Sequence, residues 1–221
     1  MLKIGSYDKL HVRQLHFPFG CNLRLLYISD LHFSGWASHI LQQVLEVCQD
    51  IRPDIILLGG DLVDFPTGFK LLSQFIQQQS CPVYAIHGNH DEMVGLDNVK
   101  NCVMRSGGHW LDKPIAIHRT LSISGIPQKT NTPYSILCTH DPAIFPDAVQ
   151  AGYTLTLAGH LHGGQMVIAQ YKDRLYPGAF VYQWNGDIFK SGNSTLIVSK
   201  GVHDTIPIRW NCQREVILCY C

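Results

Sequence analysis

Short runs of apolar residues recur along the chain and are separated by polar turns. Five of these runs are too short for a typical helix and rich in aliphatic side chains, which predicts strands buried on both faces. They cover Leu23–Ile28, Ile55–Leu58, Val83–Ile86, Ser135–Cys138 and Thr154–Ala158. Between the first three runs, apolar residues recur at helical spacing in residues 40–48 and 69–76, which predicts a β-α-β-α-β beginning.

The second half of the chain is richer in predicted strands than the first. Further apolar runs cover Ile115–Ile117, Leu121–Ile126, Gln165–Ala169, Thr195–Ser199 and Glu215–Tyr220. We expect them to form a second sheet that packs on the first. With 221 residues, the chain is predicted to be a single α/β domain, residues 1–221, built as a two-sheet sandwich.

Composition narrows the function classes. Lys and Arg together number 17, as do Asp and Glu, so no net charge draws the whole molecule to nucleic acid. No export signal or 18-residue apolar run is present, and the eight Cys form no Cys-x-x-Cys pair, so we expect a cytoplasmic protein with reduced, buried thiols. The 12 His are about twice the number expected for this length, which favours metal or acid-base chemistry.

Polar side chains follow each of the five runs, at the point where the predicted strand ends. They are Asp30 and His32, then Asp61 and Asp64, then Asn89, His90 and Asp91, then His140, and finally His160 and His162. Any one of them alone is typical of a helix cap, a turn or a hydrogen-bonded histidine. Ligands of α/β sheets gather at the carboxyl ends of the strands. The combination at five strand ends therefore favours a functional site.

The residue types in this set indicate its chemistry. Imidazoles, carboxylates and an amide, without thiolates, favour Mn, Fe or Zn in a catalytic site over a cysteine-type structural zinc. The set is too large for one ion and suits two ions about 3.5–4 Å apart, an arrangement that binds a phosphoryl centre. Asp61 follows the tight Gly59-Gly60 turn and is the natural bridging ligand. A water held between two cations would be largely hydroxide near neutral pH and could attack phosphorus.

Five segments, in chain order, resemble the signature of the calcineurin-like metallophosphoesterases. They are Asp30-Leu31-His32, Gly60-Asp61-Leu62-Val63-Asp64, Gly88-Asn89-His90-Asp91, Thr139-His140 and Gly159-His160-Leu161-His162. The resemblance implies a four-layer sandwich of two mixed β-sheets flanked by helices, and two divalent metal ions, with Mn²⁺ favoured over Fe or Zn. It implies that the first ion binds Asp30, His32, Asp61 and His162, and the second Asp61, Asn89, His140 and His160. It also places His90 beside the phosphate, as a proton donor or a stabiliser of charge, and makes Asp64 its orienting carboxylate.

Further segments resemble one branch of the family, which contains bacterial YkuE-type phosphoesterases and the UDP-2,3-diacylglucosamine pyrophosphatase of lipid A synthesis. These segments are His160 to Gln165, Ile86 to Asp91, Val198 to Gly201, Ile206 to Arg209 and Glu215 to Leu218. Leu161 stands where the family usually has Thr, and Arg214 where it usually has Pro. Neither position is a metal ligand, so these departures concern substrate placement.

Apolar side chains also occupy the loops beside the expected site: Phe33, Trp36, Phe65 to Phe69, Met93, Val94, Leu96 and Tyr182 to Trp184. They either cover the core or form an apolar lip that receives acyl chains and touches a membrane surface. A second phosphate would need basic residues near the site. The sequence does not show whether candidates such as Arg105, Arg119, Lys129 and Lys172 lie there.

Three functional hypotheses follow. In the first, the protein hydrolyses UDP-2,3-diacylglucosamine to a lipid monophosphate and UMP, at the inner face of the membrane. The second keeps the chemistry but supplies a soluble nucleotide, phosphomonoester or phosphodiester. The third is a non-catalytic interaction scaffold on the same fold, which the intact set of ligand-type residues disfavours. In none of them is nucleic acid the partner.

Overall fold

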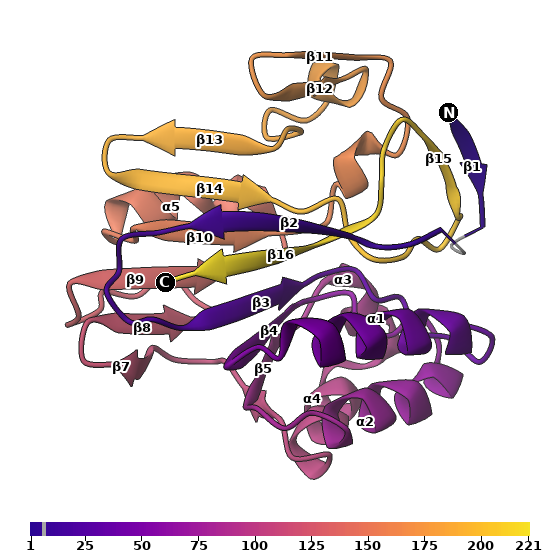
Figure 1. Ribbon diagram of the computed structural model, residues 1–221, viewed down its shortest axis with the longest axis horizontal. Coiled ribbons are helices and arrows are strands. Elements are labelled where there is room, and N and C mark those ends of the chain that lie inside the picture. Colours follow the sequence, from indigo (N-terminus) through magenta and orange to yellow (C-terminus); the bar gives the residue numbers. More distant parts are fainter. Residues whose placement is uncertain (6–7) are drawn as a thin grey trace.

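Two six-stranded mixed sheets face each other at the centre of the computed structural model, which describes residues 1–5 and 8–221 (Figure 1). The first sheet has the order β2 (His11–His16), β16 (Glu215–Tyr220), β3 (Arg24–Ile28), β4 (Ile55–Gly59), β5 (Val83–Ile86) and β6 (His109–Trp110). The second has the order β13 (Ile188–Ser191), β14 (Ser194–Val198), β10 (Leu155–Ala158), β9 (Tyr134–Cys138), β8 (Leu121–Ser124) and β7 (Ile115–His118).

Helices cover the outer faces of both sheets (Figure 1). The helices are α1 (Ser38–Ile51), α2 (Phe69–Gln77), α3 (Asn89–Val94), α4 (Leu96–Arg105) and α5 (Phe145–Gln150). Helices α1, α2 and α4 lie against the first sheet and α5 against the second, so the expected four-layer sandwich is confirmed. Two small ribbons lie outside the sandwich: β1 (Leu2–Ile4) with β15 (Ile208–Trp210), and β11 (Ala169–Tyr171) with β12 (Arg174–Tyr176). Single 3-10 turns span Pro66–Gly68, Pro142–Ile144, His162–Gly164 and Gly178–Phe180.

Successive side chains of each central strand serve two different cores. In β3, Leu26 and Ile28 pack in the cluster that the helices α1 and α2 share with the first sheet. Leu25 and Tyr27 belong to the cluster between the two sheets. Because both faces of these strands are buried, their sequences are continuous apolar runs rather than alternating ones.

Most predicted strands lie within one or two residues of their observed bounds, but two expectations were wrong. Glu215–Tyr220 does not join the second sheet: it pairs with β2 and β3 in the first. Gln165–Ala169 is not a strand, because the chain turns there with positive φ at Gly163, Gly164 and Gln165, and β11 begins only at Ala169. All eight cysteines are free, and five of them are buried.

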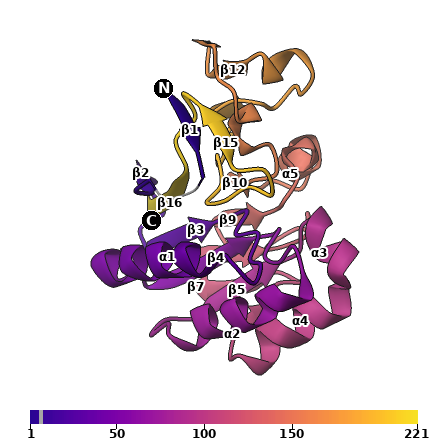
Figure 2. The same ribbon diagram turned by 90° about the vertical axis from the view of Figure 1, so that its right-hand side faces the viewer.

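The carboxyl ends of β3, β4, β5, β9 and β10 come together at one edge of the sandwich. This edge is on the right of Figure 1 and faces the viewer in Figure 2. Strands β3, β4 and β5 are parallel to one another, and so are β9, β10 and β14, so the loops that leave them converge there. Among the described residues, no helix has the length and apolar character needed to cross a membrane.

Candidate metal centre

The backbone after three of these strands adopts a conformation that non-glycine residues rarely take. The φ angles are 59° at Asp30, 43° at His32, 51° at Asp61, 71° at His160 and 49° at His162. Such left-handed residues cost roughly 1–3 kcal/mol each and are concentrated at functional sites. Hydrogen bonds across the site hold the curled loops, since the His160 N–H donates to Asp30 Oδ1 at 3.0 Å. The curl turns ligand-type side chains toward one another.

A first cluster forms where the loops after β3 and β10 meet. His32 Nε2 lies 3.4 Å from His162 Nε2, and the same atom of His162 lies 3.6 Å from Asp30 Oδ1. Asp30 and His32 are buried, while the His162 side chain is partly exposed. These atoms all lie within 4.8 Å of one another, so the three side chains can reach one ion.

A second cluster surrounds His140. Its Nε2 lies 3.2 Å from Asp61 Oδ2, 3.1 Å from Asn89 Oδ1 and 3.1 Å from His160 Nδ1. Asp61 Oδ2 also lies 3.8 Å from His32 Nε2 of the first cluster. This one carboxylate oxygen therefore lies between the two clusters.

The spacing of these donor atoms fits divalent ions. Two ligands, each about 2.1 Å from an ion at about 90–110°, are about 3.0–3.4 Å apart. The observed separations within the clusters are 3.1 to 3.6 Å, and the donors are nitrogen and oxygen only. The seven side chains expected as ligands lie in these two neighbouring clusters, with the Asp61 carboxylate between them.

Buried charge shapes the protonation of the second cluster. Burial works against the charged form of His140, but its hydrogen bond to Asp61 and the charges of Asp30 and Asp61 raise its pKa to about 9. Burial alone would also raise the pKa of Asp61, but the hydrogen bond and charge of His140 hold that pKa well below its usual range. The second cluster thus pairs a carboxylate with an imidazole whose proton a bound cation would displace.

Three of the histidines are oriented through their other ring nitrogen. His32 Nδ1 lies 2.6 Å from Asp64 Oδ1, and His140 Nδ1 lies 3.0 Å from the Gly59 carbonyl oxygen, to which it can donate. His162 Nδ1 lies 2.8 Å from Asp204 Oδ1. Carboxylate and carbonyl partners of this kind fix the ring orientation and increase the basicity of a ligating histidine.

Asp204 is itself held by a buried ion pair. Arg209 donates to it from Nε at 2.7 Å and from Nη2 at 2.8 Å. Next to it, the Thr205 hydroxyl donates to Asp64 Oδ2 at 2.9 Å. Asp204 and Thr205 were not predicted as site residues from the sequence, and Arg209 was recognised only within the segment Ile206 to Arg209. The available signal was their position shortly after the predicted strand Thr195–Ser199.

His90 lies at the rim of the two clusters, and its side chain is 29% exposed. Its Nδ1 is 2.9 Å from Asp64 Oδ1, the oxygen that also contacts His32. The expected pairing of His90 with Asp64 is thus present in the geometry, although Asp64 is shared. Asp91 does not join the site: its carboxylate accepts hydrogen bonds from the N–H groups of Leu62, Val63 and Gly88, and burial raises its pKa to about 7.

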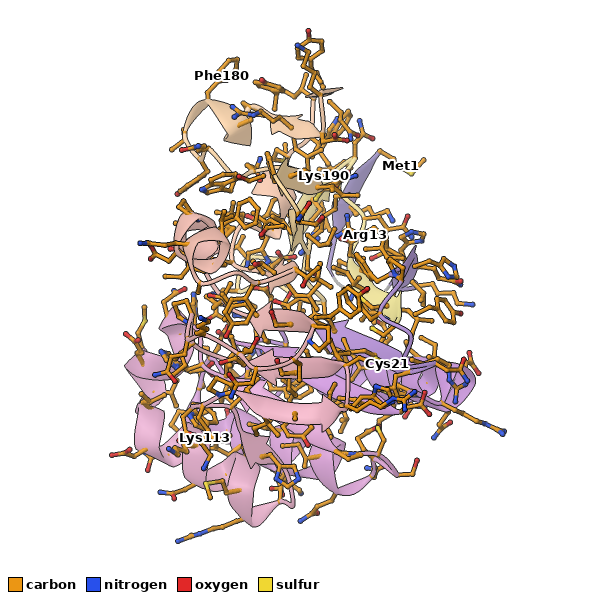
Figure 3. The ribbon with its side chains drawn as sticks, turned by 90° about the vertical axis from the view of Figure 1, so that its left-hand side faces the viewer. Met1, Arg13, Cys21, Lys113, Phe180 and Lys190 are labelled. Carbon is orange, nitrogen blue, oxygen red and sulfur yellow. The ribbon has the colours of Figure 1, made fainter. Side chains whose placement is uncertain are left out.

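The apolar lip is present only in part. Phe33 is fully buried, Phe69 and Val94 pack against the helix-covered core, and Trp184 packs between Phe145 and Phe189. The exposed members are Trp36, Phe65, Met93 and Tyr182. Phe180, which was not among the predicted lip residues, is 80% exposed on the β11–β12 side, at the opposite end of the molecule from Lys113 (Figure 3).

Comparisons with known proteins agree with this geometry. The sequence model of the calcineurin-like phosphoesterase family matches residues 23–164. The uncharacterized metallophosphoesterase YkoQ of Bacillus subtilis is 27% identical over 174 residues, which cover 67% of this chain and 64% of YkoQ. The phosphodiesterase YaeI of Escherichia coli is 23% identical over 88% of this chain and 80% of its own length. Proteins of this family are metal-dependent hydrolases of phosphoester bonds, which confirms the expectation of an enzyme.

A solved structure shares the fold. Phosphopantetheinyl hydrolase from Mycobacterium tuberculosis superposes with a TM-score of 0.50 at 12% identity, over 86% of this chain and 96% of its own. For the lipid A branch the likeness is short: UDP-2,3-diacylglucosamine hydrolase of Shewanella pealeana is 32% identical over 93 residues, 37% of this chain and 39% of that protein. The family is therefore established, whereas the branch stays a prediction.

Proposed function

This chain belongs to the calcineurin-like phosphoesterase family, and we propose that it hydrolyses a phosphodiester or pyrophosphate bond at two divalent ions held by the two clusters. The observation that carries the proposal is the position of Asp61 Oδ2, 3.2 Å from His140 Nε2 and 3.8 Å from His32 Nε2. A carboxylate oxygen between two donor groups is what a pair of neighbouring ions needs as a shared ligand.

Divalent ions, when bound, polarise phosphoryl oxygens and lower the pKa of water. The ligands that we propose are Asp30, His32, Asp61 and His162 for one ion, and Asp61, Asn89, His140 and His160 for the other. Mn²⁺ is our preferred metal, with Fe and Zn as alternatives. The carboxylates of Asp30 and Asp61 would balance part of the positive charge of the two ions.

We assign the proton transfer to His90. Its imidazole lies at the rim, where a leaving oxygen would emerge, and is partly exposed to solvent. Protonated, it would donate a proton to that oxygen; neutral, it could not. Asp64 Oδ1, 2.9 Å from His90 Nδ1, would orient the ring so that Nε2 faces the substrate.

UDP-2,3-diacylglucosamine is the finer candidate substrate. It is supported by the short similarity to the Shewanella pealeana hydrolase and by the exposed apolar residues Trp36, Phe65 and Met93, which acyl chains could cover. In this form of the proposal the protein acts at the cytoplasmic face of a membrane, which it touches peripherally.

The test is elemental analysis of protein purified without chelators, combined with assays on two substrates. We expect two equivalents of metal, hydrolysis of bis(p-nitrophenyl) phosphate, and loss of both ions and of activity in Asp61→Ala. Release of UMP from UDP-2,3-diacylglucosamine would support the lipid substrate, and activity on the generic ester alone would favour the broad-specificity alternative. Protein that binds no metal and stays inactive after Mn²⁺ is added would refute the proposal and favour the scaffold.

A further inference from the structure

A cleft of about 360 Å³ opens beside the second cluster, and Asn89, His140 and His160 form part of its lining. The nearly buried side chains of Ile86 and Leu111 give it an apolar interior. A volume of this size suits a small organic substituent rather than an extended chain. Because the cleft and the second cluster share residues, a phosphate bound at that cluster would direct one of its ester substituents into the cleft.

An aromatic pair contributes to the lining. The rings of Trp110 and His87 lie within 11° of parallel, with their centroids 6.3 Å apart. The Lys100 ammonium already lies 6.0 Å from the centroid of the Trp110 ring. This indole is therefore placed to attract positive charge.

Carboxylates supply the charge of the cleft. Glu92, Asp112 and Asp141 all line it, and among the described lining residues none is Lys or Arg. Lys100 offsets one of these charges from outside, at 3.2 Å from Asp112. The Glu92 side chain is 61% exposed, and within residues 1–5 and 8–221 its one ion-pair partner is the His87 imidazole, at 3.3 Å. The potential at the mouth of the cleft thus favours a cation and disfavours a second phosphate.

We infer that this cleft binds the cationic amino-alcohol substituent of a phosphodiester. The inference rests on the phosphodiester hydrolysis of the proposed function, and it names a substrate class that competes with UDP-2,3-diacylglucosamine, which has a second phosphate and no cationic substituent. A quaternary ammonium group would lie against the Trp110 face with the carboxylates around it, a combination used for choline-like groups. The same chemistry occurs in a phospholipid headgroup and in a free glycerophosphodiester.

The test compares three p-nitrophenyl phosphodiesters whose second substituent is choline, its uncharged isostere 3,3-dimethylbutyl, or ethyl. In each reaction water adds to phosphorus, the bond from phosphorus to the aryl oxygen breaks, and p-nitrophenolate leaves. We expect kcat/KM for the choline ester to exceed that for the isostere by about tenfold, since a desolvated cation–π contact and a carboxylate act together. Glu92→Gln and Trp110→Leu should reduce the ratio to about threefold or less.

Glu46→Gln is the matched control, because Glu46 is exposed on α1 and does not line the cleft. It should keep the tenfold ratio. Equal kcat/KM for the choline ester and its isostere, or a preference for an anionic substituent, would overturn the inference while the proposed function stands. Failure to hydrolyse any of the three esters, the ethyl ester included, would overturn the proposed function itself. Cleavage of glycerophosphocholine would support the inference and identify a free glycerophosphodiester as the substrate. Cleavage of phosphatidylcholine vesicles instead would support it and identify a phospholipid headgroup.

Discussion

Replacing Asp204 with Asn tests whether a residue outside the metal clusters controls them. The carboxylate of Asp204 is 2% exposed and contacts three nitrogen atoms: Arg209 Nε at 2.7 Å, Arg209 Nη2 at 2.8 Å and His162 Nδ1 at 2.8 Å. Despite its burial, the hydrogen bond from His162 and the charge of Arg209 hold the pKa of Asp204 well below its usual range. An amide has one acceptor oxygen, so Asn must turn its NH₂ group toward one of these donors.

Asp204→Asn should reduce both the folding stability and the metal affinity, and the size of each effect can be worked out separately. Removing one partner of a buried ion pair leaves the Arg209 charge uncompensated and costs about 3–5 kcal/mol. For a domain of this size, about 2–4 °C per kcal/mol gives a decrease in Tm of about 6–20 °C. Losing the carboxylate that orients a ligating histidine weakens metal binding by about 10–100-fold.

The measurement is Mn²⁺ affinity by isothermal titration, with Tm from calorimetry of the metal-free protein. Asp54→Asn is the matched control, because Asp54 pairs with Arg24 at 3.4 Å and both side chains are about 40% exposed. Breaking that pair should cost no more than about 1 kcal/mol and leave metal affinity unchanged. If Asp204→Asn binds Mn²⁺ within twofold of wild type, His162 does not depend on Asp204 and the reasoning fails.

Three further predictions concern the site. His90→Ala should lower kcat by about 100-fold or more while two equivalents of metal remain bound, and loss of metal by elemental analysis would make His90 a ligand instead. Gly88→Ala would place a Cβ 2.2 Å from Asp61 Oδ1, so we expect a loss of about 1–3 kcal/mol in a denaturant titration; an unchanged midpoint would show that the loop yields. Removing metal held at 100 times its Kd should cost about 2.7 kcal/mol, seen as a Tm lower by about 5–11 °C after chelation; an unchanged Tm would mean that no structural cation was present.

The sequence predicted much of the site, because the ligand-type residues follow strands. Asp30, Asp61 and His140 each stand within a few residues of a buried apolar run, and parallel strands carry such residues to one edge. The same rule missed strand β2, whose six residues are all exposed or half-buried and include two histidines and an arginine. It also put Glu215–Tyr220 in the wrong sheet, since an apolar run does not say which neighbour it pairs with.

The chain's own sequence predicted the central buried strands and the kinds of side chain that follow them, because these depend on residues near one another in the chain. Only the tertiary structure decided which groups orient those ligands. Thr205 reaches Asp64 across 141 positions, and Asp204 supports His162 from a different loop. The cleft with Trp110 and Glu92 likewise exists only where separate elements meet. Contacts of this kind follow from how the sheets pack, and no local pattern of residues encodes that packing.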